Sequence, residues 1–411
     1  MAARFYLQNA RWLGAGVTLT LASSFGQTFF ISLFAGHLMA AFDLTDGEWS
    51  TIYLIGTLGS AAVLIQAGRL ADRMALWWLS AAILMAYAAV AVAMWANPSP
   101  LLLIGLIFGL RFCGQGMMGH IAMTAMGRWF VGHRGRAVAV AGLGYALGEA
   151  LLPPLTIPLI AWLGWRETWL VVAALLALAL TPAIGWLTRA ERVPQNAAEA
   201  TARRTGIADR HWTRAEALNH WLIWAVLPGV IAPSFIGTVI FFHQVHIAEV
   251  KGWDLATMAL AYSIYAGVAI VSALVAGWAV DRWGSARLLP VYLLPIGIAV
   301  GLLGPAQSVE TWFIVLAFTG LTTGMSNAMW GAFWAEHFGT NHLGAIKALA
   351  TSAMVFGSAL GPFVTGWGID FGLDFPEQGI FMSLYCLGAS AIFTGVARRA
   401  RVELLSPAPA E

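Results

Sequence analysis

Two charged residues stand deep inside long apolar runs of this chain, where ionisable side chains are rare. Arg111 lies in the run 101–126, and Glu149 lies in the run 137–162. A charge deep within a membrane span is costly enough to be a functional hypothesis by default. If the two runs are neighbouring antiparallel helices, both residues lie near mid-depth and could pair. Gln115 follows Arg111 by four residues and shares its helix face.

The chemistry that such a pair offers is proton transfer and anion binding. Burial raises the pKa of a carboxyl and a nearby cation lowers it, so a Glu149 whose distance from Arg111 changes could load and release a proton. An Arg111 that is free in one state offers a bidentate fork to a carboxylate. The alternatives are a static ion pair that joins two helices and separate roles for the two residues. All three remain open at this point.

The composition favours lipid as the solvent for most of the chain. The 411 residues are 59% hydrophobic and 10% charged, and they include 20 Trp and 44 Gly. A water-soluble core cannot bury that much apolar surface. Both cysteines lie in apolar runs, so no disulfide framework is implied. Arg4 and Arg11 precede the first apolar stretch without an A-x-A-like cleavage site, which favours a retained helix over a signal peptide.

Twelve apolar segments of spanning length follow one another along the chain. They are expected at 12–36, 49–67, 77–96, 101–126, 137–162, 168–188, 221–246, 256–276, 288–306, 311–334, 345–367 and 379–397. With the N-terminus inside, almost all Lys and Arg residues fall on the cytoplasmic side, as the positive-inside rule requires. We therefore expect an all-α protein of the plasma (inner) membrane with twelve transmembrane helices and both termini in the cytoplasm.

An internal repeat divides these helices into two pseudo-symmetric bundles. A shift of 209 residues superposes, among others, Trp12 on Trp221, Tyr53 on Tyr262, Gly68 on Gly277, Asp72 on Asp281, Arg73 on Arg282 and Gly135 on Gly344. One constant offset across loops and helices is hard to obtain by chance. We expect an N-terminal six-helix bundle at 1–188, a cytoplasmic linker at 189–219 and a C-terminal six-helix bundle at 220–411. A substrate site would then lie between the bundles near mid-membrane.

The repeated loop resembles a known family. Both copies read G-x-x-x-D-R, which looks like the loop motif of the major facilitator superfamily, and the resemblance covers essentially the whole chain. A carboxylate is favoured beside the positive end of a helix dipole, so the resemblance places the Asp of each loop at the start of a helix in the other half, as a cytoplasmic gate. The alternative is that these are turn residues that fix the membrane topology and do not gate transport. The implied gating residues are Gly68, Asp72, Arg73, Gly277, Asp281, Arg282, Gly135 and Gly344.

The resemblance extends to the interior of the bundles. The stretch 111–116 is similar to the helix-four motif of the family, Arg followed by Gln-Gly, with one extra residue in the spacing. In the family such an arginine is linked to proton coupling or substrate charge, and lone glutamates carry the proton. The resemblance also places helices one, four, seven and ten around a central cavity. The expected lining residues are Gln27, Thr28, His243, Gln244, Thr323, Asn327 and Trp330.

Several function classes have no support in the sequence. No Walker-type phosphate loop is present, which argues against an ATP-driven pump. Neither a zinc-ligand cluster nor a G-x-S-x-G elbow occurs, so we expect no metal site, no cofactor and no enzyme. What the resemblance implies is a secondary active transporter working by alternating access. We expect a monomer in the lipid bilayer, with a small-molecule substrate and protons as its partners and no nucleic acid.

The substrate class is the finest prediction. The stretch 25–30 looks faintly like the monocarboxylate and oxalate–formate transporter group, which favours proton-coupled symport of a small organic anion bound by Arg111. The alternative is a proton-driven efflux antiporter for drug-like or metabolite substrates. Its family signature is a Gly-Pro on helix five, whereas this chain has Gly361-Pro362 on helix eleven.

Overall fold

The structure is a computed structural model that describes residues 2–130, 133–189 and 205–405. Within these ranges the regular elements are all helical, which confirms the all-α prediction. The chain divides into two compact units, Met1–Thr201 (unit 1) and Ala202–Glu411 (unit 2). Each unit is described by itself.

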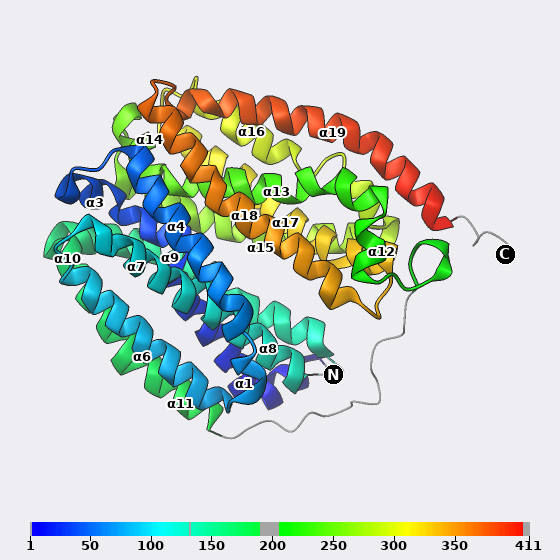
Figure 1. Cartoon of the computed structure of the whole chain (residues 1–411), viewed down its shortest axis with the longest axis horizontal. Coiled ribbons are helices and arrows are strands. Elements are labelled where there is room, and N and C mark those ends of the chain that lie inside the picture. Colours follow the sequence, from blue (N-terminus) through cyan, green and yellow to red (C-terminus); the bar gives the residue numbers. More distant parts are fainter. Residues whose placement is uncertain (1, 131–132, 190–204, 406–411) are drawn as a thin grey trace. The chain divides into compact units, whose positions relative to one another are not determined.

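Unit 1 consists of six rods, several of which change helix type along their length. Its elements are α1 (Ala2–Ser23), η1 (Ser24–Gly26), α2 (Thr28–Ile31), η2 (Ser32–Phe34), α3 (Ala35–Phe42), α4 (Asp46–Ala67), α5 (Leu70–Arg73), α6 (Leu76–Trp95), α7 (Pro100–Leu110), η3 (Arg111–Met118), α8 (Gly119–Trp129), α9 (Arg134–Leu163), α10 (Trp165–Ala174), η5 (Leu175–Leu180) and α11 (Thr181–Thr188). The segments η3 and η5 are π-helical. Helix α1 packs along α9, and α4 packs along α7 (Figure 1).

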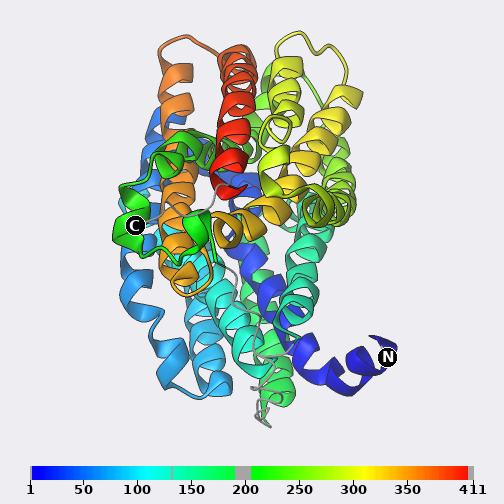
Figure 2. The same ribbon diagram turned by 90° about the vertical axis from the view of Figure 1, so that its right-hand side faces the viewer.

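Unit 2 contributes another six long or medium-length rods. Its elements are η7 (Ile207–Asp209), α12 (Arg214–Leu218), α13 (Trp221–Phe242), α14 (Gln244–Lys251), α15 (Leu255–Trp283), η8 (Ser285–Leu288), α16 (Leu294–Leu303), α17 (Glu310–Phe338), α18 (Leu343–Asp370) and α19 (Phe375–Leu405). Helix α13 packs along α18, α15 along α17 and α16 along α19 (Figure 2). The segment η7, in the predicted linker, packs against α17 and α19. The linker residues 190–204 lie outside the described residues.

The long helices turn large apolar side chains outward, as expected for contact with hydrocarbon. Leu178 is 77% exposed, Leu274 71% and Ile392 67%. Within the described ranges, nine helices are long and apolar enough to cross a membrane, and the bent rod of α1 to α3 makes a tenth. The other two rods are the short helix α16 and helix α17, whose apolar run is interrupted by Thr, Ser and Asn. Twelve rods match the twelve predicted spans.

The two units end and begin helices at equivalent repeat positions. Thr45 and Asp254, which are 209 residues apart, are the N-caps of α4 and α15. Each side chain accepts a hydrogen bond from the backbone N–H three residues on. Asp43 (φ 53°) and Gly252 (φ 66°), also 209 residues apart, cap α3 and α14 in the left-handed region, which glycine adopts freely and Asp tolerates.

Candidate functional site

Two helices of unit 1 lose regular geometry at the same place. Helix α1 gives way to η1, Gln27 is extended (φ −81°, ψ 155°), and the first rod bends by 46°. The neighbouring rod is π-helical over Arg111–Met118. The two irregular segments touch, because a Cβ atom built on Gly114 would lie 2.7 Å from the Cα atom of Gly26. Broken and π-helical segments at membrane depth are typical of functional sites.

Arg111 begins the π-helical segment and is only 1% exposed. Its Nη1 donates to the Gly26 carbonyl oxygen (3.2 Å) and to Thr28 Oγ1 (3.4 Å). The guanidinium also lies 5.2 Å from the centroid of the Tyr53 ring, and the hydroxyls of Tyr53 and Thr28 share a hydrogen bond of 2.5 Å. We call Arg111, Thr28 and Tyr53 the Arg111 centre.

Arg111 leaves most of its own N–H donors unused. Nε and Nη2 of Arg111 are buried and have no hydrogen-bond partner, and no carboxylate among the described residues forms an ion pair with the guanidinium. A buried cation normally needs such partners. The arrangement therefore suits a ligand that brings its own negative charge and acceptor oxygens.

Glu149, on α9, is partly buried and forms no ion pair with Arg111 or with any other cation that the structure describes. The static pairing that the sequence left open is thus not present in this conformation. One turn before Glu149, the Tyr145 hydroxyl hydrogen-bonds Ser23 of α1, and Tyr145 interacts electrostatically with Glu149. We call Glu149, Tyr145 and Ser23 the Glu149 centre.

The break in the first rod contacts both centres. Gln27 Nε2 donates to Ser23 Oγ (3.2 Å), which belongs to the Glu149 centre. The two neighbours of Gln27 in the chain, Gly26 and Thr28, accept from the guanidinium of the Arg111 centre. A change in the shape of this short segment would therefore alter hydrogen bonds of both centres.

Gln115 lies in the same π-helical segment as Arg111 and is partly buried. Its side chain forms no hydrogen bond with the described residues. A four-residue spacing is close to one full turn of a π-helix as well as of an α-helix. The common face expected for Arg111 and Gln115 stays a prediction.

Three of the predicted cavity residues line one pocket of unit 2. Thr323, Asn327 and Trp330 of α17 border a cavity of about 290 Å³ whose other walls come from α13 and α18. The stacked rings of Trp330 and Trp334 have centroids 5.3 Å apart. Lys347 of α18 also lines the pocket and has no hydrogen-bond or ion-pair partner among the described residues. The pocket thus combines a cation with an aromatic wall.

Lys347 was missed by sequence reasoning, although a signal was present. It stands just inside the apolar run 345–367, where a charge is expensive. It lies near one end of the run, and depth along a helix does not say which neighbours a long side chain meets.

His243 and Gln244 are buried among helices and do not line this pocket. His243 Nε2 shares a hydrogen bond of 2.8 Å with Thr365 Oγ1 of α18. Gln244 Oε1 accepts a hydrogen bond of 2.8 Å from the Tyr262 hydroxyl of α15. Both contacts join the end of the α13–α14 rod to its neighbours, a positioning function for the elements around the pocket.

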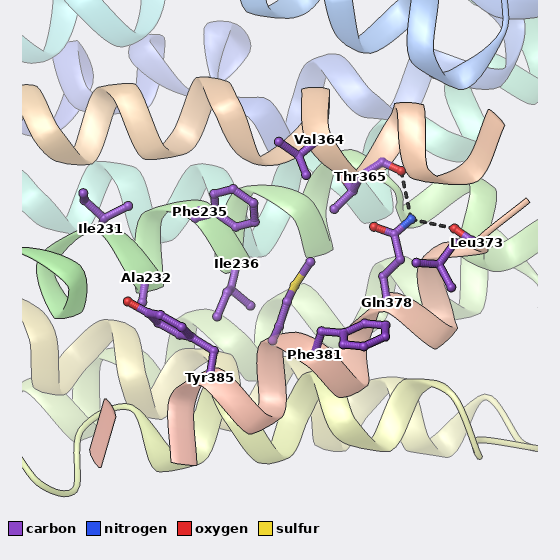
Figure 3. A pocket seen from close by; sticks show the side chains of 11 residues that line it. Ile231, Ala232, Phe235, Ile236, Val364, Thr365, Leu373, Gln378, Phe381 and Tyr385 are labelled. Carbon is purple, nitrogen blue, oxygen red and sulfur yellow. Dashed lines mark hydrogen bonds between the residues drawn. The ribbon is translucent and has the colours of Figure 1, made fainter. Parts of the chain in front are cut away.

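A second cavity of unit 2, of about 410 Å³, lies between α13, α18 and α19. Figure 3 shows apolar side chains over most of its wall, including Phe235, Ile236 and Phe381. At one end the Gln378 amide nitrogen donates to the backbone oxygens of Thr365 (2.9 Å) and Leu373 (2.7 Å). No charged residue lines this cavity, so it is a poorer match for an anion than the pocket with Lys347.

The loop motif of unit 1 is held by two side chains of α8 that the sequence did not single out. His120 Nε2 donates to the carbonyl oxygen of Gly68 (3.0 Å), and Arg128 Nη1 donates to the carbonyl oxygen of Ala71 (2.9 Å). About two helical turns separate His120 from Arg128, so they project from one face. A basic residue near the end of a helix usually indicates only the orientation of that helix in the membrane. The contact of Arg128 with the loop could therefore not be inferred from the sequence.

The other predicted gating residues lie at helix ends with open surroundings. Gly135 and Gly344 are the second residues of α9 and α18, and a Cβ on either would meet no atom within 4 Å. The same holds for Gly277 in α15. Asp281 and Arg282 are exposed, and the side chains of Asp72 and Arg73 lie outside the described part of the chain. The docking of each Asp on the other half stays a prediction.

Comparisons with known proteins agree on one family. The model of the Major Facilitator Superfamily matches residues 17–362 and 232–402. A relative from Thermoproteus tenax, an uncharacterized 38 kDa protein in a 23S RNA operon, is 26% identical over 409 residues, which cover 98% of each chain.

Two solved structures of a bacterial homolog of the human lysosomal transporter Spinster share the fold. Its inward-facing, unoccupied form has a TM-score of 0.74 at 16% identity and covers 97% of this chain and 99% of that chain. Its occupied form has a TM-score of 0.71 at 17% identity, with coverage of 98% and 99%. The chain therefore belongs to the Major Facilitator Superfamily and is a multi-pass membrane protein, a secondary transporter of small molecules and not an enzyme.

Proposed function

We propose that this transporter moves a small, monocarboxylate-like organic anion together with a proton, by alternating access, across the plasma membrane. The observation that carries the proposal is the Arg111 guanidinium, which is buried, has two nitrogens without partners and is not paired with a carboxylate among the described residues. A planar carboxylate accepts two parallel N–H bonds from such a fork.

The pocket of unit 2 supports the same substrate class. Lys347 supplies a second unpaired cation, and Asn327 supplies amide donors on the facing helix. The pocket is small, about 290 Å³, at the low end of the range for ligand sites, roughly 300–1,000 Å³. A compact anion fits these features better than a bulky one.

The Glu149 centre is the proposed proton carrier. The Glu149 carboxyl has no ion-pair partner among the described residues, so a proton can bind and leave it without first breaking a salt bridge. Tyr145 and Ser23 connect it to the break in the first rod. When Glu149 gains a proton, its interaction with Tyr145 changes, and the change reaches Gly26 and Thr28, which hold Arg111.

Transport by proteoliposomes tests the proposal. Purified protein is reconstituted, a pH gradient is imposed, and uptake of a panel of labelled monocarboxylates is measured. We expect proton-driven uptake that Arg111→Gln reduces by about 100-fold, as for a lost charged hydrogen-bond pair worth roughly 3 kcal/mol. Arg111→Lys should restore part of it. The exposed Arg136 on α9 provides the matched control, and Arg136→Gln should transport normally.

Two outcomes would overturn this function. One is the absence of carboxylate movement in either direction under any gradient. The other is unchanged carboxylate transport in Arg111→Gln, which would show that the guanidinium does not bind the substrate. A Glu149→Gln variant that still couples uptake to the pH gradient would sink the proton-carrier role alone.

The second candidate function is efflux of drug-like or metabolite substrates in exchange for protons. It is favoured by the stacked Trp330 and Trp334 rings in the unit 2 pocket, because aromatic faces bind flat, apolar or cationic molecules. The release of an aromatic cation from loaded vesicles in a proton gradient distinguishes efflux from carboxylate symport. Release of the cation that Arg111→Gln leaves intact would favour the exporter.

A further inference from the structure

A basic cavity lies at one end of unit 2, and none of its lining residues is among those proposed to bind the transported substrate. It measures about 680 Å³ and is bordered by the turn after α15, the last turn of α17 and the end of α19. Its charged lining consists of Arg287, Arg398, Arg401 and Glu336. The cavity thus carries three guanidinium groups against one carboxylate.

The carboxylate does not neutralise the arginines. Glu336 Oε2 accepts hydrogen bonds from the backbone N–H of Ser285 (3.0 Å) and from the Ser285 hydroxyl, which fixes the start of η8. None of the three arginines has an ion-pair or hydrogen-bond partner among the described residues, and Nε of Arg401 is buried without one. Three like charges that share a cavity repel one another and favour a bound anion.

A buried imidazole adjoins the cavity. His337 is 0% exposed, and its ring stacks on Phe333 with centroids 4.2 Å apart. Its Nδ1 donates to the Phe333 carbonyl oxygen (3.0 Å), whereas its Nε2 is buried with no hydrogen-bond partner. Because the ring is covered, the arginines, and not His337, are the groups that can reach an oxyanion in the cavity.

The remaining wall of the cavity is apolar and of the kind found at a membrane surface. Trp283 is 44% exposed and packs edge-on against Trp278, which is 56% exposed. Exposed Trp residues near helix ends mark the headgroup level of a bilayer. Val402, 65% exposed, and Leu404 complete the lining. The cavity is therefore lined by both cationic and apolar side chains, a combination that fits a molecule with a charged head and a hydrocarbon tail.

We propose that this basic cavity binds an anionic phospholipid, with the phosphate held by Arg287, Arg398 and Arg401 and an acyl chain along Trp283 and Val402. Arginine is suited to phosphate because its planar fork matches two phosphate oxygens. Basic recesses between membrane helices on the cation-rich side bind such headgroups. A lipid seated there would tie the α15–η8 turn, which follows the second copy of the loop motif, to the end of α19.

Lipid titration of the purified full-length protein tests the site. The thermal unfolding midpoint and the lipid affinity, from native mass spectrometry, are measured in phosphatidylcholine with increasing phosphatidylglycerol. We expect the anionic lipid to raise the midpoint of the wild type. The double variant Arg287→Gln/Arg398→Gln should bind it about tenfold more weakly and lose most of that rise. Both replaced arginines are exposed, so its midpoint in phosphatidylcholine alone should equal that of the wild type.

The matched control removes two exposed arginines of unit 2 that do not line the cavity. Arg210 and Arg399 pair with Glu216 and Glu403, and Arg210→Gln/Arg399→Gln carries the same charge change. We expect it to keep the wild-type response. Equal losses in both double variants, or no loss in either, would overturn the site in favour of general adsorption to a charged bilayer. Equal protection by inorganic phosphate at matched concentration would overturn the lipid as its occupant.

Discussion

Tyr53 serves the Arg111 centre in two ways, through its ring and through its hydroxyl. The ring faces the guanidinium at 5.2 Å, and the hydroxyl bonds Thr28, which in turn accepts from Arg111. The repeat places Tyr262 209 residues on. This residue is equally buried, its hydroxyl donates to Gln244, and its ring stacks on Phe241 with centroids 5.5 Å apart. The two tyrosines are thus alike in burial and in a side-chain hydrogen bond, while their rings have different neighbours.

The contribution of the Tyr53 ring can be separated by a double-mutant cycle with Arg111. Tyr53→Phe should lower the free energy of unfolding by about 1 kcal/mol, since the hydrogen bond to Thr28 is lost. The further change from Phe to Leu removes the aromatic face and leaves a cavity. That step should cost about 1–2 kcal/mol more in the presence of Arg111 than in an Arg111→Gln background, because only the former loses the cation–π contact of a desolvated guanidinium. Denaturant unfolding measures the variants, and equal Phe-to-Leu differences in the two backgrounds would contradict the contact.

Gly114 is required by the close approach of the two irregular segments. A Cβ atom there would lie 2.3 Å from the Tyr87 hydroxyl and 2.7 Å from the Gly26 Cα atom. Gly114→Ala should therefore destabilise the protein by about 1–3 kcal/mol through overpacking, measured as a lower unfolding midpoint. Gly105, one rod segment earlier on α7, has open space. Gly105→Ala should be neutral or slightly stabilising, and an equally neutral Gly114→Ala would refute the close contact.

Among the elements, the start of α13 should respond to pH near the usual pKa of histidine. His220 is its N-cap, and Nδ1 accepts from the Leu222 N–H (3.3 Å). Burial lowers the pKa of His220 from its usual 6.5, against the smaller opposing effect of Glu403. The unfolded chain therefore binds this proton more tightly than the folded chain. The stabilisation is complete above the usual pKa and is lost as the pH falls from 6.5 through the lowered folded value.

Replacing His220 by Asn separates the effect of histidine titration on stability from the effect of the helix cap. His220→Asn keeps an acceptor for the helix N-terminus but does not titrate. Between about pH 7 and about pH 5 the unfolding midpoint of the wild type should fall more steeply than that of the variant. Parallel curves would show that His220 does not contribute to the acid sensitivity.

The order and approximate positions of the spans could be predicted from sequence, because apolar length is a local feature. The helix ends could not: α1 begins at Ala2 instead of 12, and α19 ends at Leu405 instead of 397, because polar turns extend these rods beyond their apolar runs. The break at Gln27 and the π-helix at Arg111 could not be predicted in this way. They depend on the contact between Gly26 and Gly114, which lie far apart in the chain and have no local signature.

The charges of the candidate site are visible in the sequence, but its contacts are not. An intramembrane Arg and Glu are conspicuous in sequence, whereas their partners are backbone oxygens and hydroxyls of other helices. Thr28 was expected to line a cavity, and in the structure its hydroxyl accepts a hydrogen bond from Arg111. Lys347 stands near one end of its apolar run, and the pocket it lines is formed by three helices. Side-chain direction is a property of packing, which the pattern of a single helix does not contain.

For the whole molecule, the predicted orientation in the membrane can be tested by labelling. Both native cysteines, Cys113 and Cys386, are buried, so background reaction should be low. A cysteine placed at Gln307, between α16 and α17, should react with a membrane-impermeant maleimide in intact cells. One placed at Arg210 should react only after permeabilisation. The opposite pattern would invert the topology that the arginine distribution predicts.

The paired turns at Asp43 and Gly252 bear on the evolutionary origin of the molecule. Both have left-handed backbone, both follow the last helix of a first rod, and they are one repeat length apart. A residue that must adopt positive φ is constrained by backbone geometry and not by the chemistry of the site. We infer that the turn was present in a single ancestral gene before it was duplicated and fused. The side chains then diverged, with Arg111 in one descendant half and Lys347 in the other, and so did the lengths of some rods, since α15 (Leu255–Trp283) outruns its counterpart α4 (Asp46–Ala67).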